Sequence, residues 1–414
     1  MQNKAKKYLK KTGWIYNLNA RIKAVLNLKK LKRLQEYYSA KAKEAGIKYG
    51  ASDAIQAVRK NLAARGINTG SFPIGKLRIF WVGTNIAQDE SGFLQGLRHF
   101  GEVVSFKNEL GDYGMAGANV DQRHPDIAKI IESNGRALLT QVEKANTEKR
   151  IDLFLGQMWA DVLDAEVLQK IQKMGIPVIN ISMDDKLPAL WDSYRGRRMG
   201  AVGLGKGVDL TLTTTPEVCP WYAVEGYPAI YWPLASDPKI FYPRADKKYD
   251  VVFIGSNYGL RTKLVEAIEK AGIHADAFGP GWPNGSRGAE ESAEIFGSAK
   301  IILGTGNIGY NEDVFTIKLR DFDAPMSGAL YITHRNPDLL DLFEENREIV
   351  CYASIDECVQ KIRYYLDHPN EMQKIAEAGF IRASQNYFWD KRIGDTLALL
   401  GFSTAGGDGS ELHK

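Results

Sequence analysis

The sequence predicts an α/β protein of two domains, and three observations carry this prediction. The chain has 414 residues, 44% of them apolar and 25% charged, which is ordinary globular composition and too long for one typical domain. From Leu77 onward, short β-branched runs alternate with amphipathic segments, a pattern typical of a parallel sheet wound by crossover helices. Three prolines interrupt this alternation at 233–246, after which it starts again. We therefore expect two facing α/β units with a ligand cleft at the carboxyl ends of their strands.

Each half contains several segments with the composition of buried strands. In the first half they are LRIFWV at 77–82, VVSF at 103–106, IDLFL at 151–155, PVINI at 177–181 and VDLTLT at 208–213. In the second half they are DVVFIG at 250–255, a segment near 273–278, KIILG at 300–304, ALYIT at 329–333 and EIVCY at 348–352. Two helix starts are predicted as well, by the capping pair Ser354 and Glu357 and by Asn336 before Pro337.

Basic residues are concentrated at the start of the chain. Residues 1–50 contain 14 lysines and arginines and two acids, a net charge of +12, whereas the remaining 364 residues carry a net charge of −8. Because most of the molecule would repel phosphate, the sequence disfavours a uniformly basic nucleic-acid-binding surface.

Apolar residues recur at helical spacing within this basic segment. The apolar positions are Trp14, Ile15, Leu18, Ile22, Val25 and Leu26, and the cations near them are Lys23, Lys29, Lys30, Lys32 and Arg33. A basic amphipathic helix of this kind suits an anionic membrane surface. Docking on the body of the protein, a coiled-coil partner and a binding site for another subunit are the alternatives.

The sequence carries few targeting or redox signals. No run approaches eighteen apolar residues, and the lysine-rich start lacks the long apolar stretch of a secretory signal. The three cysteines, Cys219, Cys351 and Cys358, include no C-x-x-C pair. We therefore expect a cytoplasmic protein, either free or peripheral on the inner face of the cytoplasmic membrane.

Two short motifs invite interpretations that their context does not support. The segment GTGNIG at 304–309 matches a dinucleotide fingerprint, but no clear helix follows it, so a glycine-rich turn beside a ligand cleft is the better interpretation. The segment DFD at 321–323 resembles a metal clamp, yet it lies just before a predicted helix. We expect no metal there, with Asp321 solvated and Asp323 facing the cleft.

Longer stretches carry a family resemblance. They are DVVFIGSNYGLR at 250–261, FGPGW at 278–282, KLRDFDAPMSGALYITHRNPDLLDLF at 318–343 and YASIDECVQKIRYYLDHPNEMQKIAEAGFIR at 352–382. This order of segments resembles the C-terminal Rossmann-like domain of GT-B type glycosyltransferases, in the group 1 and spore-maturation-protein-like family. The segment 209–243 resembles the last strands and the linker of their N-terminal domain.

The resemblance implies a nucleotide-sugar donor, UDP- or dTDP-linked, bound mainly by the second domain. Backbone amides of a glycine-rich turn before a helix suit a diphosphate, and arginine adds a bidentate contact. In the family, an acid of an F-E-A segment contacts the ribose, and here the shorter aspartate stands in Phe322-Asp323-Ala324. The predicted donor-binding residues are Gly255, Ser256, Arg261, Gly279, Lys318, Arg320 and Asp323. Lys318 and Arg320 would share a face if their segment is extended, and Trp282 would either stack on the base or pack in the core.

A general base is expected in the first domain if the reaction inverts the anomeric carbon. The candidates lie in two segments, 83–92 and 183–186, each of which comes after a predicted strand. They are Asp89, Glu90 and Asp184, with Asp185 beside them. We expect neither a cofactor nor a metal, because paired cations and helix-terminal amides can stabilise the departing nucleoside diphosphate.

The predicted domains are a basic helical extension at 1–70, a Rossmann-like acceptor domain at 71–235, a Rossmann-like donor domain at 236–400 and a flexible tail at 401–414. The function predicted for them is metal-independent transfer of a hexosyl or deoxyhexosyl group to a hydroxyl of a bacterial cell-surface glycan or lipid-linked acceptor, as in polysaccharide, lipopolysaccharide or O-antigen biosynthesis. A nucleotide-sugar epimerase and a non-catalytic sugar- or nucleotide-binding module of an assembly complex are the alternatives.

Overall fold

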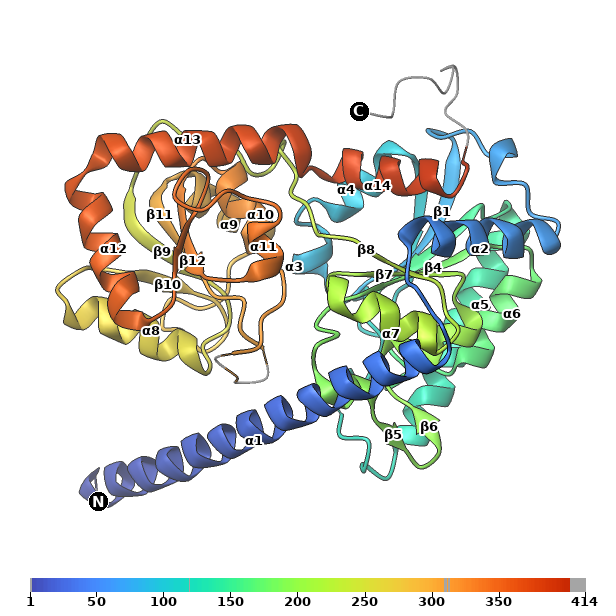
Figure 1. Cartoon of the computed structure of the whole chain (residues 1–414), viewed down its shortest axis with the longest axis horizontal. Helices are drawn as coiled ribbons and strands as arrows, with labels where there is room; N and C mark the ends of the chain where they lie inside the picture. Colours follow the sequence, from blue (N-terminus) through green and yellow to red (C-terminus); the bar gives the residue numbers. More distant parts are fainter. Residues whose placement is uncertain (1, 119, 309–310, 312, 403–414) are drawn as a thin grey trace. The chain divides into compact units, whose positions relative to one another are not determined.

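The computed structural model describes residues 2–118, 120–308, 311 and 313–402, with side chains from residue 22 onward. Contacts divide these residues into two units. The N-terminal unit comprises residues 41–185, 189–240 and 383–402, and the C-terminal unit comprises residues 2–40, 186–188 and 241–382. Each unit contains one large parallel sheet with helices around it, so the predicted α/β class is confirmed (Figure 1).

The sheet of the N-terminal unit has six parallel strands in the order β2-β1-β3-β4-β7-β8. Pairing sets Ile79 beside Val103 on one side and Leu153 on the other. The strands are β1 (Leu77–Val82), β2 (Gly101–Ser105), β3 (Leu153–Gly156), β4 (Val178–Ser182), β7 (Leu210–Thr213) and β8 (Ala229–Tyr231). All residues of β1, β3, β4 and β7 are buried, which explains why these segments are rich in apolar residues.

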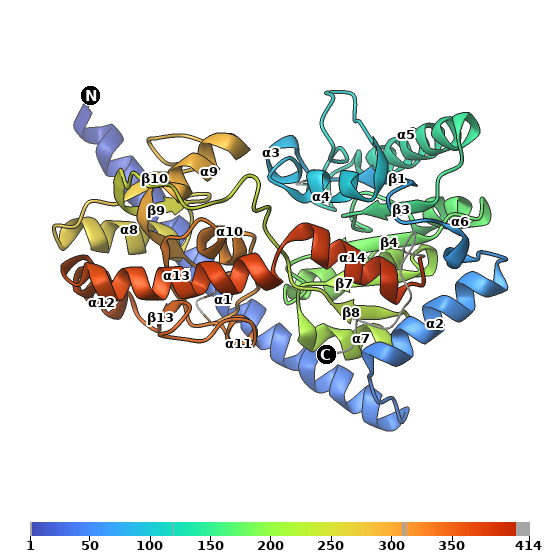
Figure 2. The ribbon, with the colours of Figure 1, turned by 90° about the horizontal axis from the view of Figure 1, so that it is seen from above.

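Seven helices among the described residues belong to this unit, and Figure 2 shows them from above. They are α2 (Ala51–Ala64), α3 (Ile86–Asp89), α4 (Phe93–His99), α5 (Ile127–Glu148), α6 (Ala165–Lys173), α7 (Cys219–Val224) and α14 (Trp389–Leu399). A short antiparallel ribbon joins β5 (Ser193–Tyr194) to β6 (Arg197–Arg198). Helix α14 packs on α4 at Gly96, where a Cβ atom would lie only 2.6 Å from Cβ of Trp389.

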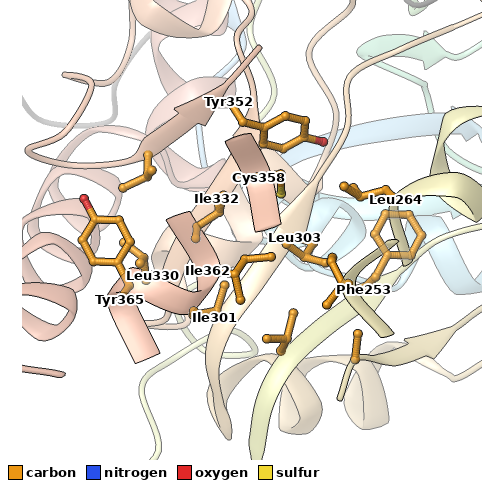
Figure 3. Packing of buried hydrophobic residues seen from close by; sticks show 14 of the residues in the cluster. Phe253, Leu264, Ile301, Leu303, Leu330, Ile332, Tyr352, Cys358, Ile362 and Tyr365 are labelled. Atoms are coloured by element: carbon orange, nitrogen blue, oxygen red, sulfur yellow. The ribbon is translucent and has the colours of Figure 1, made fainter. Parts of the chain in front are cut away.

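The sheet of the C-terminal unit has five parallel strands in the order β10-β9-β11-β12-β13. They are β9 (Tyr249–Ile254), β10 (Asp276–Phe278), β11 (Ala299–Gly304), β12 (Leu330–His334) and β13 (Val350–Tyr352). Apolar side chains of the strands pack with those of three helices in one core, including Phe253, Leu264, Ile301 and Ile362 (Figure 3). This core holds the carboxyl ends of the strands in a fixed position.

Six helices follow strands of this second sheet. They are α8 (Leu260–Lys270), α9 (Ala289–Gly297), α10 (Arg320–Met326), α11 (Pro337–Leu340), α12 (Ile355–Asp367) and α13 (Pro369–Asn386). Both predicted caps are confirmed, because Ser354 Oγ accepts the Glu357 amide at 3.2 Å and Asn336 Oδ1 accepts the Asp338 amide at 3.2 Å.

Helix α1 (Gln2–Glu44) contains most of the basic extension. Leu31 and Tyr38 are buried, whereas Ile22, Val25 and Leu26 are about half exposed. The side chains of Trp14, Ile15 and Leu18 lie outside the described ones. Every helix in the described part of the chain is too short or too polar to cross a bilayer.

The division by contacts differs from the predicted domain boundaries in two places. Residues 383–402 group with the N-terminal unit rather than with the second domain, and the predicted extension 1–70 is divided after residue 40. The change of unit after Ile240 falls inside the predicted linker 233–246, which holds no helix or strand apart from an isolated bridge at Ser236. Of the predicted tail, residues 403–414 lie outside the described part of the chain.

Candidate functional site

The candidate site of the C-terminal unit is built around the turn after β9. Gly255 follows the strand, and its amide donates to the Phe278 carbonyl at 2.8 Å. A Cβ atom on Gly255 would lie 2.6 Å from Nη2 of Arg320 and 3.4 Å from Nη1 of Arg261. Glycine therefore lets two guanidinium groups approach the same stretch of backbone.

Arg261 lies in the first turn of α8 and is only 8% exposed. Its Nη1 donates to the Ser256 carbonyl at 3.2 Å, and its Nε lies 3.4 Å from Thr305 Oγ1. The ring of Tyr258 faces the guanidinium group at 4.4 Å. These contacts fix Arg261 beside the turn, so the alternative of an exposed surface residue is wrong.

Arg320 is the first residue of α10, and its side chain contacts the same turn. Its Nε and Nη2 donate to the Ile254 carbonyl at 3.0 and 2.6 Å. Its Nη1 is buried and has no hydrogen-bond partner among the described residues. Both guanidinium groups also lie on the Phe253 ring, at 4.7 Å for Arg320 and 5.7 Å for Arg261.

A pocket opens next to this arginine pair. Its walls come from the start of α8 and from the loop after β11, and they are formed by Tyr258, Gly259, Leu260, Arg261, Thr305, Asn307 and Asn311. Amides at the N-terminus of α8 and the cationic side chain of Arg261 favour an anionic ligand in this pocket.

Gly279 and Trp282 both contact the backbone of the turn at Gly255. Gly279 has a φ of 127°, and a Cβ atom there would lie 2.4 Å from the Gly255 carbonyl oxygen. The indole Nε1 of Trp282 donates to that same oxygen at 2.8 Å, and the ring packs edge-on against Phe253. Of the two interpretations of Trp282, the structure therefore favours core packing.

At the start of α10, the condition set for Lys318 and Arg320 is not met, and the prediction for Asp321 is wrong. Lys318 precedes the helix while Arg320 already belongs to it, so the two residues do not lie on one extended segment. Asp321 was expected to be solvated, but it is 2% exposed and accepts hydrogen bonds from Tyr331 Oη and from the Lys318 amide. Burial raises the pKa of Asp321. Its carboxyl group thus fixes the beginning of the helix.

Asp323 lies in the first turn of the same helix, as the resemblance implied, and is buried. The loop after β11 supports the interpretation of GTGNIG as a turn, because the next helix in the described residues is α10, and Thr305 and Asn307 line the pocket. Residue 309 of that motif lies outside the described part of the chain.

Sequence reasoning missed Tyr258, Thr305 and Asn311 as residues of the pocket. Tyr258 belongs to the segment 250–261, which resembles the family, and Thr305 belongs to the glycine-rich segment 304–309. Their position after two adjacent parallel strands, β9 and β11, was the signal that could have joined them.

In the N-terminal unit, Asp89 ends helix α3 and is 2% exposed. Its carboxylate accepts from the Thr84 amide at 3.1 Å and from Trp81 Nε1 at 3.3 Å. Burial raises the pKa of Asp89 to about 6, although these hydrogen bonds oppose the shift. Such a carboxyl group changes its charge near neutral pH.

Glu90 has a different environment from Asp89. Its carboxylate accepts from Tyr113 Oη, from Gln95 Nε2 at 3.2 Å and from Arg98 Nη1 at 3.4 Å.

The third candidate segment follows β4. Asp184 is half-buried with a φ of 62°, an uncommon conformation for a residue other than glycine. Asp185 is buried, and its carboxylate accepts from Ser182 Oγ at 2.5 Å and Thr213 Oγ1 at 2.6 Å. Burial raises the pKa of Asp185 to about 6. Because this carboxyl group is enclosed, we expect it to contribute to the stability of the N-terminal unit.

No cluster of three or more His, Cys, Asp or Glu residues suitable for a metal ion occurs among the described residues. The three cysteines are free and buried.

Comparison with protein families identifies the segment that carries the arginine pair. Residues 261–398 match a family model described as glycosyl transferase-like. This segment is therefore similar to glycosyl transferases. It begins at Arg261 and includes Arg320 and Asp323. No curated protein matches the sequence significantly.

Solved structures share the fold over most of the chain. Sucrose-phosphate synthase from Thermosynechococcus elongatus aligns with a TM-score of 0.54 and 11% identity, over 78% of this chain and 98% of its own. A glycosyltransferase from Rickettsia africae aligns with a TM-score of 0.52 and 12% identity, over 78% of this chain and 98% of its own. HepE from Anabaena, in complex with UDP and glucose, aligns with a TM-score of 0.50 and 12% identity, over 78% of this chain and 100% of its own. The chain thus has the two Rossmann-like domains of the GT-B fold, as predicted.

Proposed function

We propose that the chain is a glycosyltransferase that moves a sugar from a nucleotide-sugar donor to an acceptor hydroxyl. The observation that carries this proposal is the convergence of Arg261 and Arg320 on the turn at Gly255, beside the pocket at the start of α8. A buried Nη1 of Arg320 without a partner among the described residues is costly unless an anion pairs with it. A diphosphate supplies such an anion.

The arginine pair suits the chemistry of the departing nucleotide. In the transfer, the bond between the anomeric carbon and the diphosphate oxygen breaks, and the acceptor oxygen forms the new bond and loses its proton to a base or to water. Negative charge grows on the diphosphate as it leaves, and fixed cations and amides lower the energy of that state. Arg261, Arg320 and the amide of Ser256 would stabilise it without a metal ion.

The remaining donor residues have roles by resemblance. Asp323 would accept hydroxyl hydrogen bonds from the ribose, Lys318 would contact the phosphates, and Gly279 would shape the turn. The donor would carry UDP or dTDP, and the presence of UDP and glucose in HepE supports the first of these. Asp89, Glu90 or Asp184 of the N-terminal unit would take the acceptor proton if the reaction inverts.

The acceptor would be a growing cell-surface glycan or a lipid-linked sugar of a bacterium. The enzyme would then work in the cytoplasm at the inner face of the membrane, with residues 1–50 contacting the membrane surface or a partner subunit. The net charge of +12 in this segment supports such a contact. Transfer of a hexosyl or deoxyhexosyl group fits this role.

A panel of nucleotide sugars tests the proposal. Isothermal titration with UDP-, dTDP-, GDP- and CMP-sugars should show one nucleotide bound selectively. Arg320→Gln should weaken its binding by about ten- to a hundredfold, since charge-assisted hydrogen bonds contribute about 1.5–3 kcal/mol. Arg347→Gln, at an exposed arginine of the same unit, is the matched control and should bind normally.

Three results would contradict or redirect the proposal. Absence of binding to every nucleotide would refute it, and normal binding by Arg320→Gln would refute the role of the arginine pair. Turnover of the bound sugar without any acceptor would identify an epimerase. Binding without turnover in the presence of acceptor extracts would favour a non-catalytic module.

A further inference from the structure

Helix α1 presents two different faces. Residues 24, 31 and 38 recur every seven positions and therefore lie on one side of the helix. Leu31 and Tyr38 are 5% and 2% exposed, and the Ala24 carbonyl accepts a hydrogen bond from Asn311 Nδ2 at 3.0 Å. Asn311 is itself a wall of the pocket described above. At Ala24, this side of α1 thus contacts the pocket loop of the C-terminal unit.

The opposite side of α1 is both apolar and basic. Ile22, Val25 and Leu26 are 49%, 55% and 54% exposed, and Lys29 and Arg33 continue the same side at helical spacing. Lys23, Lys30 and Lys32 flank it and are exposed, and residues 22–35 contain no acid. Exposed apolar groups beside a cluster of basic residues fit an anionic lipid surface, where the apolar atoms enter the interface and the cations meet headgroups.

We propose that α1 binds an anionic bilayer surface through the face formed by Ile22, Val25, Leu26, Lys29 and Arg33. The opposite face contacts Asn311 through the Ala24 carbonyl, so it would link the unit that contains the pocket to the membrane-bound helix. A protein partner is less well suited to this face, because a protein interface core is depleted in lysine whereas this face is rich in it. The proposal deepens the proposed function by naming the partner of residues 1–50.

Flotation of the full chain tests the binding. The protein should float with vesicles of phosphatidylcholine and phosphatidylglycerol, should not float with phosphatidylcholine alone, and should be released by salt. Replacing Ile22, Val25 and Leu26 together by serine should lower partitioning at least about tenfold. Serine at Leu110, Ile381 and Leu399, three other exposed apolar positions, is the matched control.

The charge contribution has its own variants. Lys29→Gln with Arg33→Gln should weaken binding to the anionic vesicles by about fivefold for each cation removed. The control pair is Lys144→Gln with Lys374→Gln, at exposed lysines of other helices.

Spin labels test which face enters the lipid. Because the three native cysteines are buried, an introduced cysteine can be labelled selectively. A label at Leu26→Cys should become shielded from a water-soluble nickel complex on anionic vesicles, whereas a label at the neighbouring Asn27→Cys should stay accessible.

Several outcomes would overturn the proposal. They are equal flotation with both vesicle types, no flotation, equal shielding of both labels, and shielding of Leu26 by self-association without lipid. Flotation requires no nucleotide, so failure of this proposal is distinguishable from failure of the transferase proposal, which titration measures separately.

Discussion

At the residue scale, two buried carboxyl groups of the N-terminal unit have the same raised pKa and different surroundings. Asp89 is the last residue of α3, where the Thr84 amide and Trp81 Nε1 donate hydrogen bonds to it. Asp185 is enclosed by the hydroxyl groups of Ser182, Thr213 and Tyr222. We expect the first to affect the pH dependence of activity and the second the pH dependence of stability.

For Asp89, we predict a loss of activity at low pH. A general base works only when deprotonated, so kcat/KM should fall as pH decreases below about 6, the pKa of Asp89. Asp89→Asn should remove this limb and lower kcat by about a hundredfold or more, with nucleotide affinity unchanged. Glu90→Gln is the comparison variant and should keep the decrease of kcat/KM below about pH 6. If Asp89→Asn is active and shows the same decrease, another residue is the general base.

For Asp185, we predict that rising pH destabilises the folded protein. Burial raises its pKa from 3.8 to about 6, so between these values the unfolded chain loses the proton first, and the free energy of unfolding falls as pH increases. Above pH 6 the loss is complete, on the order of 2–3 kcal/mol. Urea unfolding at pH 5 and pH 8 should show Asp185→Asn gaining stability relative to the wild type as pH rises; a constant difference would contradict this.

At the scale of elements, the turn after β9 depends on a glycine in the neighbouring strand's loop. Gly279 and Gly272 both have positive φ, 127° and 79°, but they differ in the space around them. A Cβ atom at Gly279 would meet the Gly255 backbone, whereas one at Gly272 would meet nothing within 4 Å.

We therefore predict a larger effect at Gly279 than at Gly272. Gly272→Ala should cost about 1 kcal/mol through backbone conformation alone. Gly279→Ala adds a steric conflict, so it should destabilise the C-terminal unit by a further 1–3 kcal/mol, roughly, and weaken nucleotide binding. Chemical denaturation and titration measure these two effects, and equal losses for both variants would show that the close approach has no role.

Local patterns were enough to predict most elements. The run at 77–82 coincides with β1, because a strand buried on both faces is mostly apolar. The role of Asp321 could not be predicted in this way, since its burial depends on Tyr331, ten residues farther along in β12. The pocket likewise joins loops after β9 and β11, which only strand order brings together.

At the scale of the whole molecule, the last helix shows that domain membership is not local. Trp389 opens α14 and packs on Phe93 at 5.0 Å and on Trp232 at 5.8 Å between ring centroids. The Ser236 amide also donates to the Tyr387 carbonyl at 2.9 Å. The sequence pattern predicts a helix here but not its partner, so the predicted boundary at residue 400 differs from the contact-based one.

We predict that Trp389→Ala destabilises the N-terminal unit. The loss of a large buried aromatic side chain should cost about 3–5 kcal/mol. Nucleotide affinity should be retained, because the arginine pair and its pocket lie in the C-terminal unit. Hydrogen exchange would locate the loss, and protection lost mainly in the C-terminal unit would contradict the assignment of α14.

The bond from Trp282 to Gly255 also gives the molecule an optical probe. Of the eight tryptophans, only Trp14 and Trp282 belong to the C-terminal unit, and Trp282 touches the backbone of the arginine turn. In a Trp14→Phe background, the emission of Trp282 is the only indole signal from that unit. A ligand that occupies the turn changes the field and the quenching around this ring, so binding is readable without any label.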